Sequence, residues 1–254
     1  MKNQSLSEEQ PISVMIYYSL EISMRFTALF FLALPHSAFA DANSCYAINP
    51  NENPAESISA CSKLLATGDL EIVERAEALE NRGIAFREVG EYSKSIEDLG
   101  ASLALAENTS TMRMLAWTYR ETGRLTDAEQ LYTRVLELDT HSQGWLSRCV
   151  VRQDMERFRL ALADCQEALR QDGESLDSLY FTARAHSFLD QPEEALPLTI
   201  KAMRLAPEDP RHLVENVWAM YRLGKTIDAR KKALNGLDQF TDEPGLLSFL
   251  NQTR

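Results

Sequence analysis

Apolar residues recur every three or four positions along most of the chain, a spacing that is typical of amphipathic helices. Short polar or glycine-containing turns interrupt these helical stretches at regular intervals, and five of the turns align with one another. Their register residues are Gly90, Gly123, Glu156, Asp190 and Gly224. These residues lie 33, 33, 34 and 34 positions apart, and an apolar-periodic stretch precedes and follows each one. The pattern therefore predicts an all-α chain of about five helix–turn–helix units.

The residues around these turns resemble the tetratricopeptide-repeat (TPR) family. In that family a 34-residue unit carries W-x2-L-G-x2-Y in its first helix and A-x3-F in its second. The second unit of this chain reads Met112, Leu115, Ala116 and Tyr119, and then Ala128 and Tyr132. Small residues fill the matching slots of other units: Gly83, Cys149 and Ala183 in first helices, and Ala161, Ala195 and Ala229 in second helices. The resemblance implies a right-handed TPR superhelix (α-solenoid) in which small residues let antiparallel helices pack closely.

The repeat register divides the chain into segments. Terminal units of a solenoid act as caps, so we expect a degenerate half-repeat within an N-terminal cap at 41–75 and a C-terminal capping helix at 244–254. The expected repeats between these caps are TPR 1 at 76–108, TPR 2 at 109–141, TPR 3 at 142–175, TPR 4 at 176–209 and TPR 5 at 210–243.

The N-terminal segment resembles a secretory signal peptide. The basic Arg25 precedes the apolar run 26–34, and the A-x-A sequence Ala38-Phe39-Ala40 follows it. We therefore predict a signal peptide at 24–40 that is removed before Asp41. Residues 1–23 contain three glutamates, the wrong charge for the start of a leader, so we interpret them as an over-long start.

The four cysteines form two equally spaced pairs. Cys45 and Cys61, like Cys149 and Cys165, are 16 residues apart, and each pair is centred on a turn. Residues equidistant from the turn of an antiparallel hairpin lie at the same level, which brings each pair within reach of a disulfide. An exported chain favours this pairing, and the alternative is that Cys149 and Cys165 are simply small buried apolar residues. The cysteine arrangement also resembles that of exported TPR proteins of α-proteobacteria, which implies the periplasm of a Gram-negative bacterium.

Composition and motifs argue against several classes of function. The formal net charge is −12, and no helical stretch is consistently basic, so we expect no nucleic-acid partner. The part after residue 40 has no run of 18 apolar residues, so we expect no stable insertion in a membrane after signal cleavage. The chain has no HExxH, GxSxG, P-loop or zinc-spaced CxxC motif, and its histidines are scattered. His186 occupies a core slot, where a packing histidine is expected. We therefore predict no enzyme activity, no cofactor and no metal site.

The remaining candidate surface is the concave face, which first helices form in TPR proteins. Trp, Tyr and Arg are the residue types that dominate interface energies. We therefore expect a protein-interaction module that binds a peptide or protein partner, with an extended or carboxylate-bearing peptide favoured by the arginines. Two alternatives are that Trp117 and Trp218 pack against neighbouring repeats, and that the chain is a structural subunit of a homo-oligomer or cell-envelope assembly using its terminal helices. The predicted groove residues are Arg113, Trp117, Arg120, Tyr180, Arg184, Trp218 and Tyr221.

Overall fold

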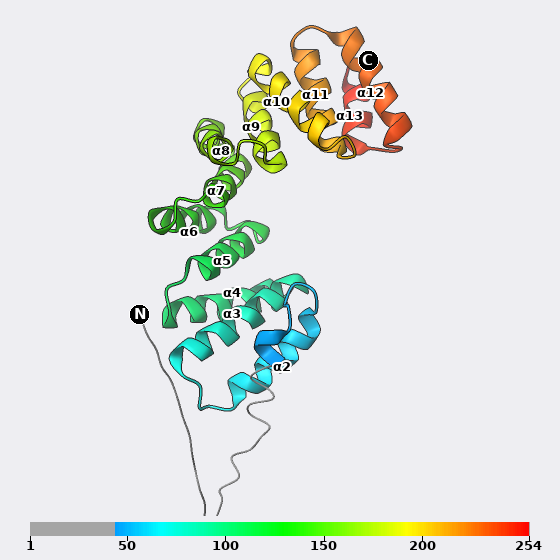
Figure 1. Cartoon of the computed structure of the whole chain (residues 1–254). Coiled ribbons are helices and arrows are strands. Elements are labelled where there is room, and N and C mark those ends of the chain that lie inside the picture. The colour runs from blue at the N-terminus through cyan, green and yellow to red at the C-terminus, as the bar shows by residue number, and fades with distance from the viewer. Residues whose placement is uncertain (1–43, 254) are drawn as a thin grey trace, which may run out of the picture. The chain divides into compact units, whose positions relative to one another are not determined.

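The structure, a computed structural model, describes residues 44–253. Within that range the regular elements are all helices, which confirms the all-α fold (Figure 1). None of these helices is both long and apolar enough to span a bilayer. The predicted signal peptide at 24–40 and the over-long start at 1–23 lie outside the described residues.

The helices alternate between two roles. Helix α2 (Pro54–Ala66) precedes the repeats, and α13 (Pro244–Gln252) follows them. The first helices of the repeats are α3 (Ile72–Glu88), α5 (Thr109–Glu121), α7 (Ser142–Asp154), α9 (Leu176–Phe188) and α11 (Pro210–Arg222). The second helices are α4 (Tyr92–Leu105), α6 (Leu125–Leu138), α8 (Phe158–Asp172), α10 (Pro192–Leu205) and α12 (Thr226–Gln239). Helix α3 begins at Ile72, four residues before the start that we expected for the first repeat.

Each repeat turns at a residue with left-handed backbone geometry. The five register residues have φ values of 78° at Gly90, 75° at Gly123, 59° at Glu156, 56° at Asp190 and 73° at Gly224. Glycine adopts this conformation freely, whereas a residue with a Cβ atom is strained there. The common backbone conformation explains why the turns align in sequence although two of them lack glycine.

Close approach of the two helices explains the small residues in the first helix. A Cβ atom added to Gly83 would lie 2.8 Å from Cγ of Leu99 in α4. In the second repeat the equivalent slots hold Ala116 and Tyr132, which are both buried. In the third they hold Cys149 and Cys165. A small residue facing a larger one is therefore the shared packing rule, and the third repeat replaces it with a covalent bond.

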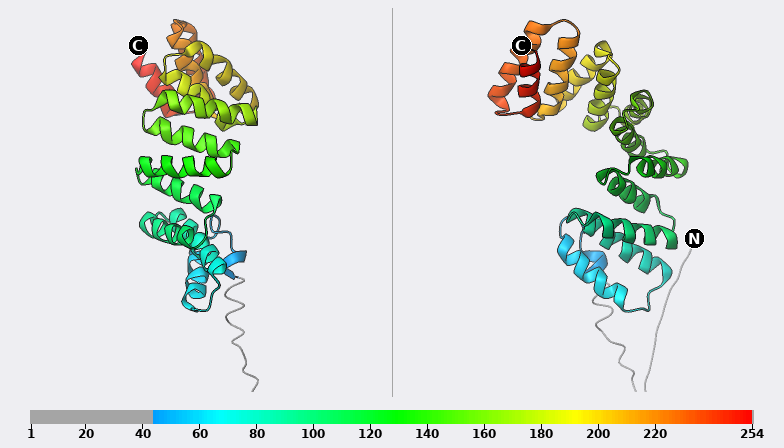
Figure 2. Two further views of the ribbon diagram at one scale, coloured as in Figure 1. Left: turned by 90° about the vertical axis from the view of Figure 1, so that its left-hand side faces the viewer. Right: turned by 180° about the vertical axis from the view of Figure 1, so that it is seen from behind.

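Packing follows the order of the chain. Each helix from α2 to α13 packs against the next one, and first helices of neighbouring repeats also contact each other: α3 with α5, α7 with α9, and α9 with α11 (Figure 2). The C-terminal helix α13 contacts both α11 and α12. The first helices consequently share one side of the stack, which we call the first-helix face.

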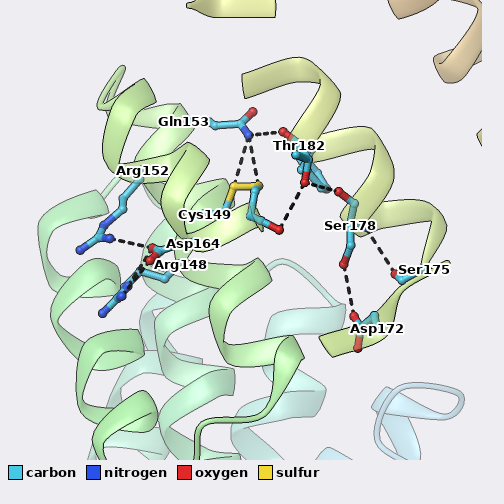
Figure 3. The surroundings of a disulfide bond; sticks show 11 residues. Arg148, Cys149, Arg152, Gln153, Asp164, Asp172, Ser175, Ser178 and Thr182 are labelled. Carbon is cyan, nitrogen blue, oxygen red and sulfur yellow. Dashed lines mark hydrogen bonds and ion pairs between the residues drawn. A yellow bond between two sulfur atoms is a disulfide. The ribbon is translucent and has the colours of Figure 1, made fainter. Parts of the chain in front are cut away.

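Both predicted cysteine pairs form disulfides in the structure. The Cα atoms are 4.7 Å apart in Cys45–Cys61 and 5.3 Å apart in Cys149–Cys165. The buried Gln153 extends the second disulfide into the next repeat (Figure 3): its Nε2 lies 3.3 Å from Sγ of Cys149 and donates to the carbonyl oxygen of Phe181 at 2.8 Å. This contact ties α7 to α9.

Arginine–aspartate pairs connect the helices of the first and third repeats. Arg82 binds both carboxylate oxygens of Asp98, at 2.7 and 2.8 Å, and Arg148 binds those of Asp164, at 2.8 and 2.9 Å. Arg152 also binds Asp164, at 2.7 Å (Figure 3). Two-point contacts of this kind fix the relative position of the paired helices.

Candidate partner-binding face

A pocket beside Trp117 crosses three neighbouring repeats. It has a volume of about 230 Å³. This volume is below the usual range for small-molecule sites but suits a side chain of a bound peptide. We call it the Trp117 pocket. Its lining residues are Trp117, Arg120, Tyr132, Gln143, Leu146, Ser147, Val150, Asp177 and Phe181.

The indole of Trp117 is exposed and held in place by polar neighbours. Its side chain is 44% exposed. Its Nε1 donates to Oε1 of Glu121 at 3.1 Å, and the Arg87 guanidinium lies 4.2 Å from its ring centroid. A second pocket, of about 250 Å³, opens on the side of the ring near Arg87 and Tyr92. Trp117 is thus a wall shared by two pockets.

Three arginines lie near the Trp117 pocket, of which Arg120 belongs to its lining. Arg120 pairs with Asp154 at 2.6 Å, whereas Arg113 forms no ion pair with any residue in the range 44–253. Burial raises the pKa of the Tyr132 hydroxyl, and the charges of Arg120, Arg113 and Arg87 oppose that rise. Three guanidinium groups therefore lie near enough to act on one buried hydroxyl.

A separate pocket lies between α9, α11 and the capping helix. Its volume is about 330 Å³, and we call it the Arg184 pocket. Burial raises the pKa of the Glu215 carboxyl in its lining, while Arg184 and Arg222 act in the opposite direction. The lining residues are Arg184, Ser187, Phe188, Glu215, Trp218, Arg222 and Gln252.

Comparison with known proteins identifies the repeat. The family model described as tetratricopeptide repeat matches residues 74–141, which include α5 and α6 in full and most of the α3–α4 hairpin. The chain is a TPR protein. One relative, the DnaJ homolog subfamily C member 7 homolog of Schizosaccharomyces pombe, is 27% identical to this chain over 154 residues. The alignment covers 54% of this chain and 32% of the relative, so the chain spans about a third of that protein's length.

Solved structures show the same fold. A tetratricopeptide repeat protein from Parabacteroides merdae superposes with a TM-score of 0.71 at 14% identity, covering 85% of this chain and 89% of that one. A MamA protein from AMB-1 superposes with a TM-score of 0.57 at 19% identity, covering 67% of this chain and 92% of that one. At these identities the likeness shows only that this chain has the same fold as those proteins.

The structure divides the predicted groove residues of this TPR protein between two pockets. Trp117 and Arg120 line the Trp117 pocket, and Arg184 and Trp218 line the Arg184 pocket. Arg113 is four residues before Trp117 on α5 but lines neither. The seven predicted residues therefore do not form a single continuous lining.

Three of the predicted aromatic residues take part in packing. The ring centroids of Trp218 and Tyr221 lie 5.0 and 5.9 Å from that of Phe249, a buried residue of the capping helix α13. Tyr180 packs against Phe181 and the buried His212, with ring centroids 5.0 and 5.9 Å apart. Trp218 thus supports α13 while one part of it lines the Arg184 pocket.

Other lining residues lie outside the predicted set. Phe181 precedes a core slot and reaches the Trp117 pocket from α9. Glu215 and Arg222 lie three residues before and four residues after Trp218, so all three share one side of α11. This helical spacing around Trp218 is the signal in the sequence that could have found them.

Two further hollows contrast with these pockets. One is lined mainly by α10 residues around Ile200, and the other by α6 residues around Arg134. Neither lining contains an aromatic residue. Aromatic side chains therefore line the Trp117 and Arg184 pockets of this TPR protein but not these two hollows.

The histidines considered as catalytic or metal-binding candidates make structural contacts. His186 is buried in its core slot, with Nδ1 2.8 Å from Oε1 of Gln191. His141 caps the N-terminus of α7. Residues 44–253 contain no group of three His, Cys, Asp or Glu side chains arranged to hold a metal ion.

Proposed function

We propose that this TPR protein is an exported, non-catalytic module that binds a peptide or protein partner along its first-helix face. The observation that carries the proposal is the Trp117 pocket, in which an exposed indole, the guanidinium of Arg120 and apolar side chains from neighbouring repeats meet. The TPR fold itself supports an interaction with proteins.

The residue types of the pocket favour a protein partner. Binding energy at interfaces concentrates in a few Trp, Tyr and Arg anchors set in desolvated pockets. Trp117 is already oriented by Glu121 and Arg87, so its ordering on binding costs little additional entropy. A partner side chain that enters between Trp117 and Phe181 would displace water from apolar surface on both sides.

A capture experiment with matched variants tests this function. The purified chain is immobilised and used to capture proteins from envelope extract of its host, and captured proteins are then purified for affinity measurements. Trp117→Ala is expected to weaken binding of the true partner by about 1–4 kcal/mol. Leu160→Ala, which truncates a 50% exposed leucine of the second helix α8, should leave the affinity unchanged.

Either of two results would contradict the proposal. One is equal affinity for wild type and Trp117→Ala. The other is assembly of the chain with copies of itself, detected by light scattering, with no captured partner; that result would favour a structural subunit.

Export to the periplasm of a Gram-negative bacterium is part of the same proposal. It is supported by the leader-like sequence at 24–40 and by the two cysteine pairs. Sequencing the N-terminus of protein isolated from its native host should give Asp41 as the first residue. Recovery from the cytoplasm with Met1 retained would refute export.

A further inference from the structure

Helix α3 begins with an extra turn that the other first helices lack. It spans 17 residues, whereas α5, α7, α9 and α11 span 13 each. The side chains of Ile72 and Val73 in this turn are 63% and 60% exposed. Glu74 closes the helix start by accepting a hydrogen bond from the backbone N–H of Glu71 at 3.1 Å. The extra turn is therefore a capped part of the helix that presents two aliphatic side chains to solvent.

Helix α12 carries a second exposed apolar surface, in the last repeat. Ile227 and Leu234 are seven residues apart, so they lie on one side of the helix, and they are 83% and 55% exposed. Neither belongs to the apolar cluster that packs α12 around the buried Phe249. Helices pack in the order of the chain, so this surface and the first turn of α3 belong to opposite ends of the stack. One chain therefore does not cover its own α3 turn with its own α12.

Opposite charges surround the two surfaces. Segment 71–80, at the start of α3, contains four glutamates and one arginine. Segment 225–239, which includes α12, contains four basic and two acidic residues. Unlike charges attract and like charges repel, so each surface is better matched by the other than by a second copy of itself. An anionic membrane is a poorer match for α12, because the formal net charge of −12 on the whole chain opposes the approach.

An exposed charge adjoins the apolar residues on each helix. Glu77 lies four residues after Val73, one turn further along the same side of α3. Lys231 lies in the same way four residues after Ile227 on α12. Both charged side chains are exposed, and neither forms an ion pair with a residue in the range 44–253. The two surfaces thus share one arrangement, an aliphatic residue followed by an unpaired charge, with the sign reversed.

We propose that copies of this chain associate head to tail, with the first turn of α3 in one copy packed against the exposed side of α12 in the next. The aliphatic side chains of the two surfaces cover each other, and Glu77 pairs with Lys231. A contact between two different surfaces leaves one of each kind free at the ends of the assembly, so growth continues beyond a dimer. The inference goes beyond the proposed function, because neither surface contains a lining residue of the Trp117 or Arg184 pocket.

This association should be weak and reversible. Four aliphatic side chains and one ion pair bury less than the roughly 1,200 Å² at which stable interfaces begin. Sedimentation equilibrium of the purified chain should therefore show a weight-average mass that rises with concentration between about 10 µM and 1 mM.

Two double variants test which surfaces meet. One carries Ile72→Gln with Val73→Gln, and the other carries Ile227→Gln with Leu234→Gln. All four sites are exposed and glutamine retains helix propensity, so both variants should fold as wild type does. Each alone should associate at least about tenfold more weakly, because every copy lacks one of the two surfaces. An equimolar mixture should recover a dimer and no larger species, since each copy carries the surface that the other lacks.

Charge reversal tests the pairing of Glu77 with Lys231. Glu77→Lys and Lys231→Glu should each weaken the association several-fold, and both changes in one chain should restore it. Leu160→Gln, the same kind of change at a 50% exposed leucine of α8, should associate as wild type does.

Three results would overturn the inference. The first is a wild-type chain that stays monomeric over the whole concentration range. The second is undiminished association of either double variant alone, which would mean that the other surface pairs with itself. The third is a monomeric chain that sediments with phosphatidylglycerol vesicles unless Ile227 and Leu234 are replaced, which would assign α12 to a membrane. None of these results affects capture of a partner at the Trp117 pocket, so the proposed function is tested separately.

Discussion

Single residues in equivalent slots decide how each helix pair is held together. The slots that hold Arg82 and Asp98 in the first repeat hold Leu115 and Leu131 in the second, which pack in an apolar cluster. In the fifth repeat they hold Asn216 and Lys232, with Lys232 Nζ 2.6 Å from Asn216 Oδ1. The fold therefore accepts either polar or apolar chemistry at this contact, as long as the two side chains complement each other.

His212 is a buried residue with an unusual environment. Its side chain is 1% exposed, and neither ring nitrogen has a hydrogen-bond partner. Burial lowers its pKa below the ordinary value of 6.5, although the charge of Asp209, 3.6 Å from Nε2, acts in the opposite direction. The native state therefore favours the neutral imidazole.

This environment predicts a loss of stability in mild acid. As the pH falls below 6.5, the unfolded chain binds a proton at His212 more readily than the native chain does, so the free energy of unfolding decreases. Between pH 7.5 and 5.5 the contribution reaches at most about 1.4 kcal/mol. Urea unfolding at both pH values should show that the loss is smaller in His212→Gln than in wild type. The control His141→Asn replaces an exposed histidine with another residue that can cap α7. It should lose as much stability between the two pH values as wild type does. An unchanged pH dependence in His212→Gln would contradict this account.

At the scale of elements, the turns set the register of the solenoid. The third and fourth repeats turn at Glu156 and Asp190 with φ values of 59° and 56°, where other repeats have glycine. A Cβ atom at Gly123 would meet no atom within 4 Å, so the difference between glycine and other residues at this turn lies in the backbone. Local strain is therefore stored in the centre of the chain.

A reciprocal pair of substitutions tests the role of the turns. Glu156→Gly should raise the free energy of unfolding by about 1 kcal/mol, because it relieves a left-handed residue with a side chain. Gly123→Glu should lower it by a similar amount for the opposite reason. Both are measured by urea unfolding at one pH. Destabilisation by Glu156→Gly would show that the Glu156 side chain, rather than backbone geometry, matters at this turn.

The α7–α8 hairpin is the repeat with a covalent cross-link. Its disulfide lies beside the Arg148–Asp164 pair and contacts Gln153 (Figure 3). The second repeat instead has Ala116 against Tyr132 and the apolar residues Leu115 and Leu131 in these slots. Helices α7 and α8 are therefore a rigid support for the Trp117 pocket, to which α7 contributes Leu146 and Val150.

Removing this disulfide should destabilise the protein measurably. The double variant Cys149→Ala with Cys165→Ala is expected to lose about 3 kcal/mol, the chain-entropy value for a loop of this length. Before that measurement, intact mass without reductant should lie about four daltons below the all-thiol value, because two disulfides form. Complete alkylation of the unreduced protein, or a double variant as stable as wild type, would contradict the prediction.

At the scale of the whole molecule, the sequence was sufficient to predict the repeats. Turn residues and small slot residues such as Ala128 and Ala161 recur with the 33- or 34-residue spacing, because every hairpin must satisfy the same backbone and packing constraints. The cysteine pairing was predictable for the same reason, since equal distance from a turn fixes the level of a residue in an antiparallel hairpin.

The composition of the pockets could not be predicted in the same way. Whether Trp218 faces solvent depends on α13, which lies outside the repeats and places Phe249 against the indole. The ring of Tyr180 similarly packs against Phe181 and against His212 of the next repeat. Side chains on the first-helix face are thus set by contacts between repeats, which slot positions within one repeat do not specify.

Photo-crosslinking in the native host tests most directly whether the partner lies on the first-helix face. Benzoylphenylalanine is placed at one position per variant: Val150 in the Trp117 pocket, Phe188 in the Arg184 pocket, or Leu160 on the second helix α8. Our account predicts a covalent adduct with the same partner from Val150 and Phe188, and none from Leu160. An adduct from Leu160 without one from Val150 or Phe188 would place the partner on the second helices and contradict the account.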